Sequence, residues 1–210
     1  IEEYAEDRYY RDTPLMLIGE GTNEIQRLVI ARQLLERHGE RQGALKPLPA
    51  EPEERRQIVQ TIRQFVERDV IPLASRYEQA DQYPVEIVEK LKELGLFGAT
   101  IPQEYGGLGL DYVTYSMIVE EICCGWMSVS GIINTHLIMA YIVQNFGTDE
   151  QKRQFLPAFA DGWLRGGLAL TESHAGSDLQ AISTSAVRRG DNYILNGAKM
   201  FITNGRYGNA

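Results

Sequence analysis

The chain has 210 residues, of which 43% are hydrophobic and 24% charged, and its formal net charge is −8. This composition is ordinary for a soluble globular protein with enough material for a substantial core. The acidic balance argues against nucleic acid or an anionic membrane surface as the main partner. No run approaches the roughly 18 apolar residues that a membrane-spanning helix needs. The two cysteines, Cys123 and Cys124, are neighbours in sequence, which favours buried thiols in a reducing compartment over a disulfide.

The amino-terminal quarter is predicted to hold one helix and a linker. The acidic opening of the chain predicts no secretory or transit segment. After Gly19, either Thr22 or Asn23 can cap a helix. The apolar positions of that helix form one stripe, which consists of Ile25, Leu28, Val29 and Leu35. Residues 38–52 are rich in Gly, Pro and charge, which is typical of a linker.

The middle of the chain is predicted to be helical. From Glu53 the apolar residues recur with a helical period until Pro72, where a kink or break is expected. Pro84 can open the next helix and Gly95 can close it. Further helices are expected at about 112–123 and 128–145.

Two shorter signals lie on either side of these last two helices. The run Gly106-Gly107-Leu108-Gly109 predicts a flexible loop. Thr148-Asp-Glu-Gln151 fits a capping box and predicts a helix to about Ala160.

His136, on an apolar stretch, is interpreted as a core histidine and His174 as a loop side chain. Neither has partners at a metal-ligand spacing, so no metal is expected.

After Gly166 the hydrophobic period changes from helical to alternating. Leu168-Ala-Leu-Thr-Glu-Ser-His-Ala-Gly-Ser-Asp178 predicts an apolar strand that runs into a turn of small residues, where backbone N–H groups and a serine hydroxyl can hold an anion. Asn196-Gly197 predicts a type I′ hairpin turn, with 199–203 as the returning strand. The resulting small sheet would offer an edge to a flat, phosphate-bearing ligand, through Thr171, Ser177, Phe201 and Thr203.

Both of these segments resemble the flavin-binding signature of the acyl-CoA dehydrogenase family. The stretch Gly19-Glu-Gly-Thr-Asn-Glu-Ile-Gln-Arg27 resembles the segment that carries the catalytic glutamate in that family. Ile101-Pro-Gln-Glu-Tyr-Gly-Gly-Leu-Gly-Leu110 and Phe146-Gly-Thr-Asp-Glu-Gln-Lys152 also fit. The order differs, because the family has its glutamate motif near the carboxyl end and this chain has it in front.

The resemblance implies a mainly α fold with a partial β domain. Residues 1–37 would be a segment of the C-terminal helical domain, followed by the linker at 38–52. Residues 53–163 would be the all-helical N-terminal domain, and 164–210 the start of the middle, flavin-binding β domain. The helix near the amino terminus and the last strands would each leave an apolar face or an open edge, which a complementing chain or further copies in an oligomer would cover.

The resemblance also assigns site residues. Glu20 is expected to be the catalytic base, with Gly21 and Ser177 on the substrate side. The residues expected to bind FAD are Leu168, Leu170, Thr171, Gly176, Ser177, Phe201, Ile202, Thr203, Thr22 and Glu24. Without the resemblance, Glu20 and Glu24 are ordinary acidic residues near a helix start, Phe201 a core aromatic, and the two threonines strand residues.

The implied activity is FAD-dependent α,β-dehydrogenation of an acyl-CoA thioester to the trans-2-enoyl-CoA. Electrons would pass to an electron-transferring flavoprotein, in the cytoplasm or, in a eukaryote, the mitochondrial matrix. Two alternatives stay open. One is an acyl-CoA oxidase, and the other is a non-catalytic structural subunit or fragment of such an assembly.

Overall fold

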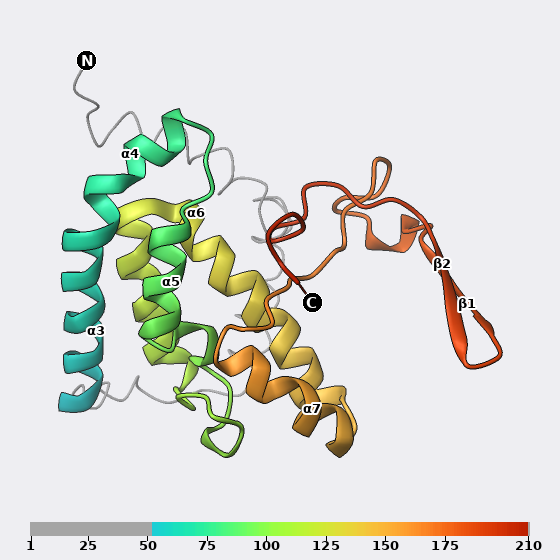
Figure 1. Cartoon of the computed structure of the whole chain (residues 1–210), viewed down its shortest axis with the longest axis horizontal. Helices are drawn as coiled ribbons and strands as arrows, with labels where there is room; N and C mark the ends of the chain where they lie inside the picture. The colour runs from blue at the N-terminus through green and yellow to red at the C-terminus, as the bar shows by residue number, and fades with distance from the viewer. Residues whose placement is uncertain (1–51, 210) are drawn as a thin grey trace, which may run out of the picture. The chain divides into compact units, whose positions relative to one another are not determined.

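The computed structural model describes residues 52–209, and the chain divides into a unit of residues 1–51 and a unit of residues 52–210. The predicted site residues Glu20, Gly21, Thr22 and Glu24 lie outside the described residues. The described part is mostly helical and carries one two-stranded sheet (Figure 1). The predicted class, mainly α with a partial β domain, is therefore confirmed.

The first helix continues through a wider turn into the second. Helix α3 (Glu53–Phe65) leads into a π-helical turn, η1 (Val66–Val70), and then into α4 (Ile71–Gln79), which carries Pro72 in its first turn. Proline lacks an N–H group, and its ring clashes with the carbonyl four residues earlier in a regular α-helix. The π turn accommodates both defects, so the interruption predicted at Pro72 is confirmed in this form.

Helix α5 (Val85–Glu93) has the predicted ends. Pro84 occupies its N-cap position, and Gly95 follows the last turn with a φ of 72°. Two short 3-10 turns follow, η2 (Leu96–Gly98) and η3 (Gln103–Tyr105). The next loop, 106–109, was expected to be flexible, but its backbone is tied down: the N–H groups of residues 107 to 110 all donate to carbonyls of residues 98 to 102.

Helix α6 (Tyr112–Phe146) consists of two helical halves that meet at Trp126, whose φ of −164° and ψ of 108° are not helical. The prediction of two helices is confirmed with a break of one residue. Helix α7 (Asp149–Ala160) starts with the predicted capping box, in which Thr148 Oγ1 accepts from Gln151 N at 3.2 Å and Gln151 Oε1 accepts from Thr148 N at 2.8 Å.

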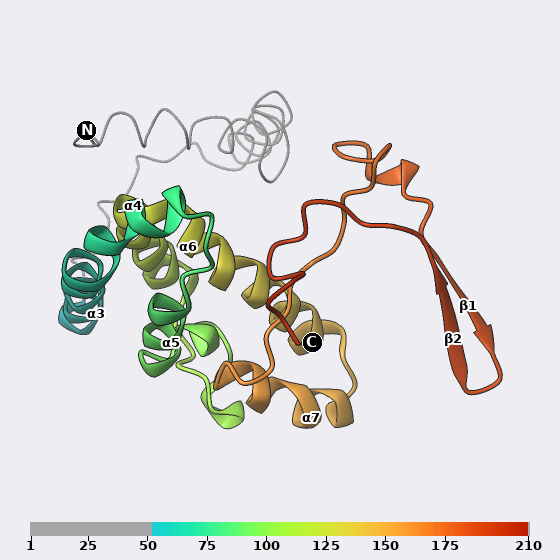
Figure 2. The same cartoon turned by 45° about the horizontal axis from the view of Figure 1, so that its top comes forward.

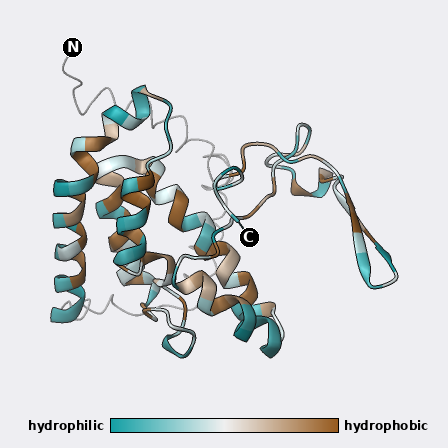
Figure 3. Ribbon diagram, in the orientation of Figure 1, coloured by the Kyte–Doolittle hydropathy of each residue, from teal (hydrophilic) through white to brown (hydrophobic). Residues whose placement is uncertain are grey.

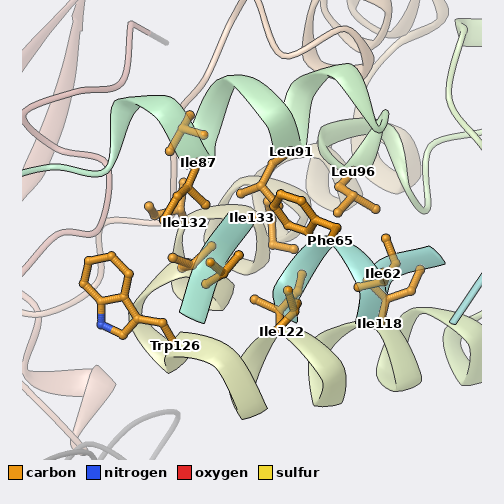
Figure 4. Close-up of a cluster of buried hydrophobic side chains, with 14 of the residues drawn as sticks. Ile62, Phe65, Ile87, Leu91, Leu96, Ile118, Ile122, Trp126, Ile132 and Ile133 are labelled. Atoms are coloured by element: carbon orange, nitrogen blue, oxygen red, sulfur yellow. The ribbon is translucent and has the colours of Figure 1, made fainter. Parts of the chain in front are cut away.

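The helices enclose two buried clusters. The larger lies between α3, η1, α5 and α6, and includes the side chains in Figure 4, such as Phe65, Leu91, Ile122 and Ile133. The smaller joins α6 to α7 through Leu137, Leu156 and Phe159. In Figure 3 the helices carry alternating bands of hydrophilic and hydrophobic colour, as expected of helices with one face in a core.

Cys124 is exposed and Cys123 half-buried, and neither forms a disulfide. The expected burial of both thiols is therefore wrong for Cys124. The reason is helical geometry. Ile122 and Gly125 lie on the buried face of α6, so residue 124 lies on the face exposed to solvent.

Among the described helices, α6 alone is long and apolar enough to cross a membrane by length and composition, with a mean hydropathy of 1.3 over its best 18 residues. That window is 44% buried inside the protein. The core helix of a soluble protein meets the same criteria, so the length and composition of α6 are weak support for a membrane span.

The carboxyl-terminal region contains strands β1 (Ser185–Arg189) and β2 (Asn192–Asn196), paired antiparallel with Val187 opposite Ile194. Residues 168–171 and 199–203 form no strand, and the hairpin turn lies at Gly190-Asp191 rather than at Asn196-Gly197. The predicted strands and turn are therefore wrong. Both Phe201 and Asn204 have positive φ, at 55° and 65°, which is incompatible with a continuous strand through 199–203.

The close contact between α6 and the π turn predicts that Gly125 cannot be enlarged. A Cβ atom at Gly125 would lie 2.5 Å from Cγ1 of Val66. We expect Gly125→Ala to destabilise the protein by about 1–3 kcal/mol because the core has no room for the methyl group. The free energy of unfolding in urea measures this effect.

Gly131→Ala is the matched control, since a Cβ atom at this position of α6 meets nothing within 4 Å. This substitution should stabilise the protein by about 0.5–1 kcal/mol through the helix propensity of alanine. Equal stability of the two variants would contradict the packing described here.

Candidate functional site: two loop segments joined by a buried carboxylate

Residues 167–171 and 199–203 run side by side although they are not a regular sheet. The N–H of Met200 donates to the carbonyl of Thr171 at 2.9 Å. At the other end, a Cβ atom on Gly167 would lie 2.8 Å from the Thr203 carbonyl oxygen. Pairing of 171 with 200 and of 167 with 203 means that the two segments run antiparallel. The two motifs singled out in the sequence thus form one surface.

The carboxylate of Glu172 lies at the centre of this surface. It is 5% exposed and forms an ion pair with Lys199, with 2.8 Å between Oε1 and Nζ. Oε2 accepts from the N–H and the hydroxyl of Ser183, each at 2.9 Å, and Oε1 also accepts from the N–H of Thr184 at 3.0 Å. One carboxylate therefore connects three stretches of chain: the 168–178 loop, the approach to β1, and the 199–203 segment.

The environment of Glu172 favours its charged form. Hydrogen bonds from Lys199, Thr184 and Ser183 hold the pKa of this carboxyl far below its ordinary value, and they outweigh the opposing effect of burial. The group is therefore ionised at neutral pH, and its charge is compensated by the Lys199 ammonium group. It is an anchor rather than a group poised to exchange protons.

Glu172 and Lys199 were not among the predicted site residues, although both stand within the motifs. A glutamate in a polar turn has no distinguishing pattern in sequence, because most such residues face solvent. Lys199 stands out in the sequence only as the first residue of a predicted strand, 199–203, and no spacing links it to Glu172. The structure instead uses that lysine within the protein.

The same surface is attached to the helical part by polar contacts from α6. The hydroxyl of Thr135 accepts from the N–H of Leu168 at 3.1 Å. Asn204 Nδ2 donates to the carbonyls of Ile132 and Gly166, each at 3.0 Å. These contacts fix both segments against the second half of α6.

The predicted cofactor residues within 52–209 lie on these two segments or on the turn that follows the first of them. Thr171 is half-buried, while Ser177 and Thr203 are exposed. Phe201, expected beside a flat ring, is 88% exposed. A Cβ atom on Gly176 would meet no protein atom within 4 Å, so the space over that loop is open to a ligand. Leu168 and Ile202 are half-buried and Leu170 is exposed.

The two histidines of the described part differ in surroundings. His136 is fully buried, with edge contacts to Phe97 and Phe159, and its Nε2 lies 3.1 Å from the Phe159 carbonyl oxygen. This is the core histidine that the sequence predicted. His174 is a loop side chain, also as predicted, with its Nε2 3.6 Å from Oε2 of Glu172. Within residues 52–209, no group of three or more His, Cys, Asp or Glu side chains is arranged to hold a metal ion.

Comparison with known protein families matches three parts of the chain. The family described as acyl-CoA dehydrogenase, N-terminal domain, matches residues 52–163. The corresponding middle domain matches residues 167–209, and the C-terminal domain matches residues 1–35. The chain belongs to the acyl-CoA dehydrogenase family, and its C-terminal-domain segment stands first, as the order of the motifs predicted.

Individual relatives give the same result. The chain is 37% identical over 145 residues to an acyl-CoA dehydrogenase of Bacillus subtilis, a match that covers 69% of this chain and 38% of that protein. It is 39% identical over 151 residues to a short-chain specific acyl-CoA dehydrogenase of Clostridium acetobutylicum, covering 70% of this chain and 39% of the relative. The matched part is thus less than two fifths of these curated relatives.

Solved structures with the same fold include the butyryl-CoA dehydrogenase of Megasphaera elsdenii. It has a TM-score of 0.71 and 30% identity, and the match covers 78% of this chain and 44% of that one. A chain in a solved structure described as the electron transferring flavoprotein of Acidaminococcus fermentans has a TM-score of 0.73 and 34% identity. The match covers 77% of this chain and 43% of that one. A glutaryl-CoA dehydrogenase of Mycobacterium smegmatis in complex with FADH2 has a TM-score of 0.70 and 30% identity, over 75% of this chain and 41% of its own.

The burial of His136 predicts that its ring does not titrate near neutral pH. Burial lowers the pKa of His136 from 6.5 to about 4. The unfolded chain takes up the proton first, so the stability due to the neutral ring is complete above pH 6.5 and is lost as the pH falls toward 4. Nitrogen-15 NMR of the imidazole should show a neutral ring from pH 8 to pH 5.

The same spectra report the tautomer. Because the Phe159 carbonyl oxygen can only accept, we expect the proton of the neutral ring on Nε2. A titration midpoint near 6.5 assigned to His136 would contradict the buried environment.

Proposed function

We propose that the chain contributes to FAD-dependent α,β-dehydrogenation of an acyl-CoA thioester, which gives the trans-2-enoyl-CoA. The observation that carries this proposal is the antiparallel contact between 167–171 and 199–203, since the two flavin-signature segments then share one open surface. Membership of the family supports the reaction class. The relatives include acyl-CoA dehydrogenases named for both short and long chains, so the proposal extends to the acyl-CoA thioester and not to its chain length.

The residues on this surface fit FAD. The hydroxyls of Thr171, Ser177 and Thr203 supply hydrogen-bonding groups for a heteroaromatic ring and its phosphates, and the exposed ring of Phe201 supplies a stacking face. Leu168, Leu170 and Ile202 would add apolar contacts from the same two segments. FAD, when bound, supplies the hydride acceptor of the reaction.

Glu20 is the proposed base, with Gly21 beside it and with Thr22 and Glu24 on the cofactor side. A carboxylate is a weak base in water, but burial beside an apolar acyl chain would raise its pKa and make it competent to remove the proton α to the thioester carbonyl. The Cα proton goes to this carboxylate while the Cβ hydrogen leaves with its electron pair, and a carbon–carbon double bond forms between the two atoms. Ser177 would contact the substrate at the mouth of the site.

The proposed reaction also requires an electron acceptor. We infer an electron-transferring flavoprotein as the electron acceptor, in line with the structural neighbour from such a system.

All ten residues of β1 and β2 are exposed, Leu195 by 73%, and the hairpin projects from the helices in both views of Figures 1 and 2. A two-stranded hairpin is marginal in water on its own. A further copy or a complementing chain that covers it would make the assembly an oligomer.

The proposed organisation keeps the boundaries given by the sequence. Residues 1–37 would supply the base from a C-terminal-type helical segment, and residues 38–52 would link it to the helical domain at 53–163. Residues 164–210 would supply the cofactor surface. The proposed location is the cytoplasm, or the mitochondrial matrix in a eukaryote, as for the mitochondrial relatives.

A non-catalytic structural subunit or fragment of an acyl-CoA dehydrogenase-like assembly is the second candidate, and the fully exposed hairpin would suit a role in assembly. An acyl-CoA oxidase is the third, and it differs in admitting oxygen to the reduced flavin. Visible absorption of bound flavin separates the first candidate from the second, and hydrogen peroxide formation after reduction separates it from the third.

The proposed base predicts the behaviour of Glu20→Gln. This variant should bind FAD as the wild type does, but butyryl-CoA should no longer bleach the flavin absorption, with the rate falling by about 100-fold or more because the proton acceptor is gone. Anaerobic stopped-flow absorption measures the rate. Glu40→Gln, which removes a carboxylate from the linker, is the control and should keep the wild-type rate. Unchanged bleaching in Glu20→Gln would exclude Glu20 as the base.

The proposed cofactor surface predicts a spectral effect of Thr203→Ala. Loss of the hydroxyl should shift the visible bands of the bound flavin or weaken its retention by about 5–10-fold, as expected for one net hydrogen bond. Thr148→Ala removes a threonine hydroxyl from the α7 cap, outside this surface, and should leave the flavin spectrum unchanged. Identical flavin spectra and affinities in the wild type and Thr203→Ala would count against this surface.

A further inference from the structure

The contacts of Glu172 have a consequence for ligand binding at the proposed site. Its carboxylate is the acceptor that the Ser183 and Thr184 N–H groups share, and it pairs with Lys199. The Lys199 ammonium group also donates to the Leu170 carbonyl at 2.9 Å. Lys199 therefore contacts both the backbone before Thr171 and the side chain after it.

These contacts set the distance between the two ligand-facing segments. Glu172 is fixed to the 175–177 turn through the mutual backbone hydrogen bonds of Glu172 and Ala175, at 2.8 and 3.2 Å. Lys199 directly precedes Met200, whose N–H pairs with Thr171. A shift of the Glu172–Lys199 pair would move Ser177 relative to Thr203, although neither ion is among the residues proposed to contact the cofactor.

We propose that Glu172 and Lys199 are a positioning pair, which holds the 171–177 loop and the 199–203 segment at the separation required by a flavin dinucleotide. The pair also carries no net charge, so the buried glutamate does not repel the phosphates of such a ligand. This inference rests on the proposed function, since it names the residues that shape the cofactor surface.

Both charges of the Glu172–Lys199 pair are needed to keep the site in shape, because each ion is the counterion of the other. Glu172→Gln would present an NH₂ group to donors that now meet a carboxylate oxygen, and it would leave the ammonium group without its counterion. Lys199→Met would leave the buried carboxylate without its counterion, with only the donors of Ser183 and Thr184. Each change should loosen the site, but through different contacts.

Amide hydrogen exchange on the full 210-residue chain tests the pair without any ligand. Glu172→Gln should lower protection at the Ser183 and Thr184 amides by about tenfold, because their charged acceptor is lost. Lys199→Met should keep that protection and lower it at Met200. Glu104→Gln removes an exposed carboxylate from η3 and should change neither. Unchanged protection at Ser183 and Thr184 in Glu172→Gln would overturn the inference.

Fluorescence titration with FAD, which measures the Kd for the cofactor, is the second test. We expect the Kd for FAD to rise about tenfold in Glu172→Gln and in Lys199→Met, with Lys199→Arg and Glu172→Asp restoring part of the loss because they keep the charges. This rescue distinguishes positioning by the ion pair from a general loss of structure. Wild-type affinity in Glu172→Gln, or no rescue by either conservative variant, would overturn the inference. A wild-type chain that binds no FAD would refute the proposed function instead, and the exchange arm would still report on the pair.

Discussion

The interaction on which the candidate site depends is the burial of one ionised glutamate among donors from three stretches of chain. Around Glu172 the backbone is not organised by a sheet, since 168–171 and 199–203 form no strand. Side-chain contacts replace the missing ladder of backbone hydrogen bonds. A buried carboxylate is costly unless every oxygen is satisfied, and this one accepts from Ser183, Thr184 and Lys199. That requirement makes the local geometry specific, because few arrangements bring so many donors to one carboxylate.

The helical part supports this site through a small number of polar contacts. The N–H of Leu168 donates to the hydroxyl of Thr135, and the Asn204 side chain donates to the Ile132 carbonyl. These hydrogen bonds hold the two loop segments against the second half of α6. The break at Trp126 separates that half from the first, which packs against α3 and the π turn. The hydrophobic core thus fixes the position of the site, and polar groups fix its shape.

The sequence predicted the helical part well and the region after Gly166 poorly. Helix ends at Pro84, Gly95 and Thr148 carry local chemistry that acts within one turn, so they were found correctly. The hairpin was placed at Asn196-Gly197 because that dipeptide favours a type I′ turn, yet the chain turns at Gly190-Asp191, where only Gly190 has positive φ. The anchoring role of Glu172 depends on contacts with Ser183, Thr184 and Lys199, which no local pattern contains. The motifs themselves were correctly singled out, and family membership confirms them.

We propose that residues 168–178 and 199–203 form one flavin-binding surface. The most direct measurement is the amide hydrogen-exchange footprint of FAD on the wild-type 210-residue chain, read residue by residue with and without the ligand. The account predicts slower exchange in both segments together, with α3 and α5 unchanged. Slowing in only one of them, or in neither while FAD binds elsewhere, would contradict it.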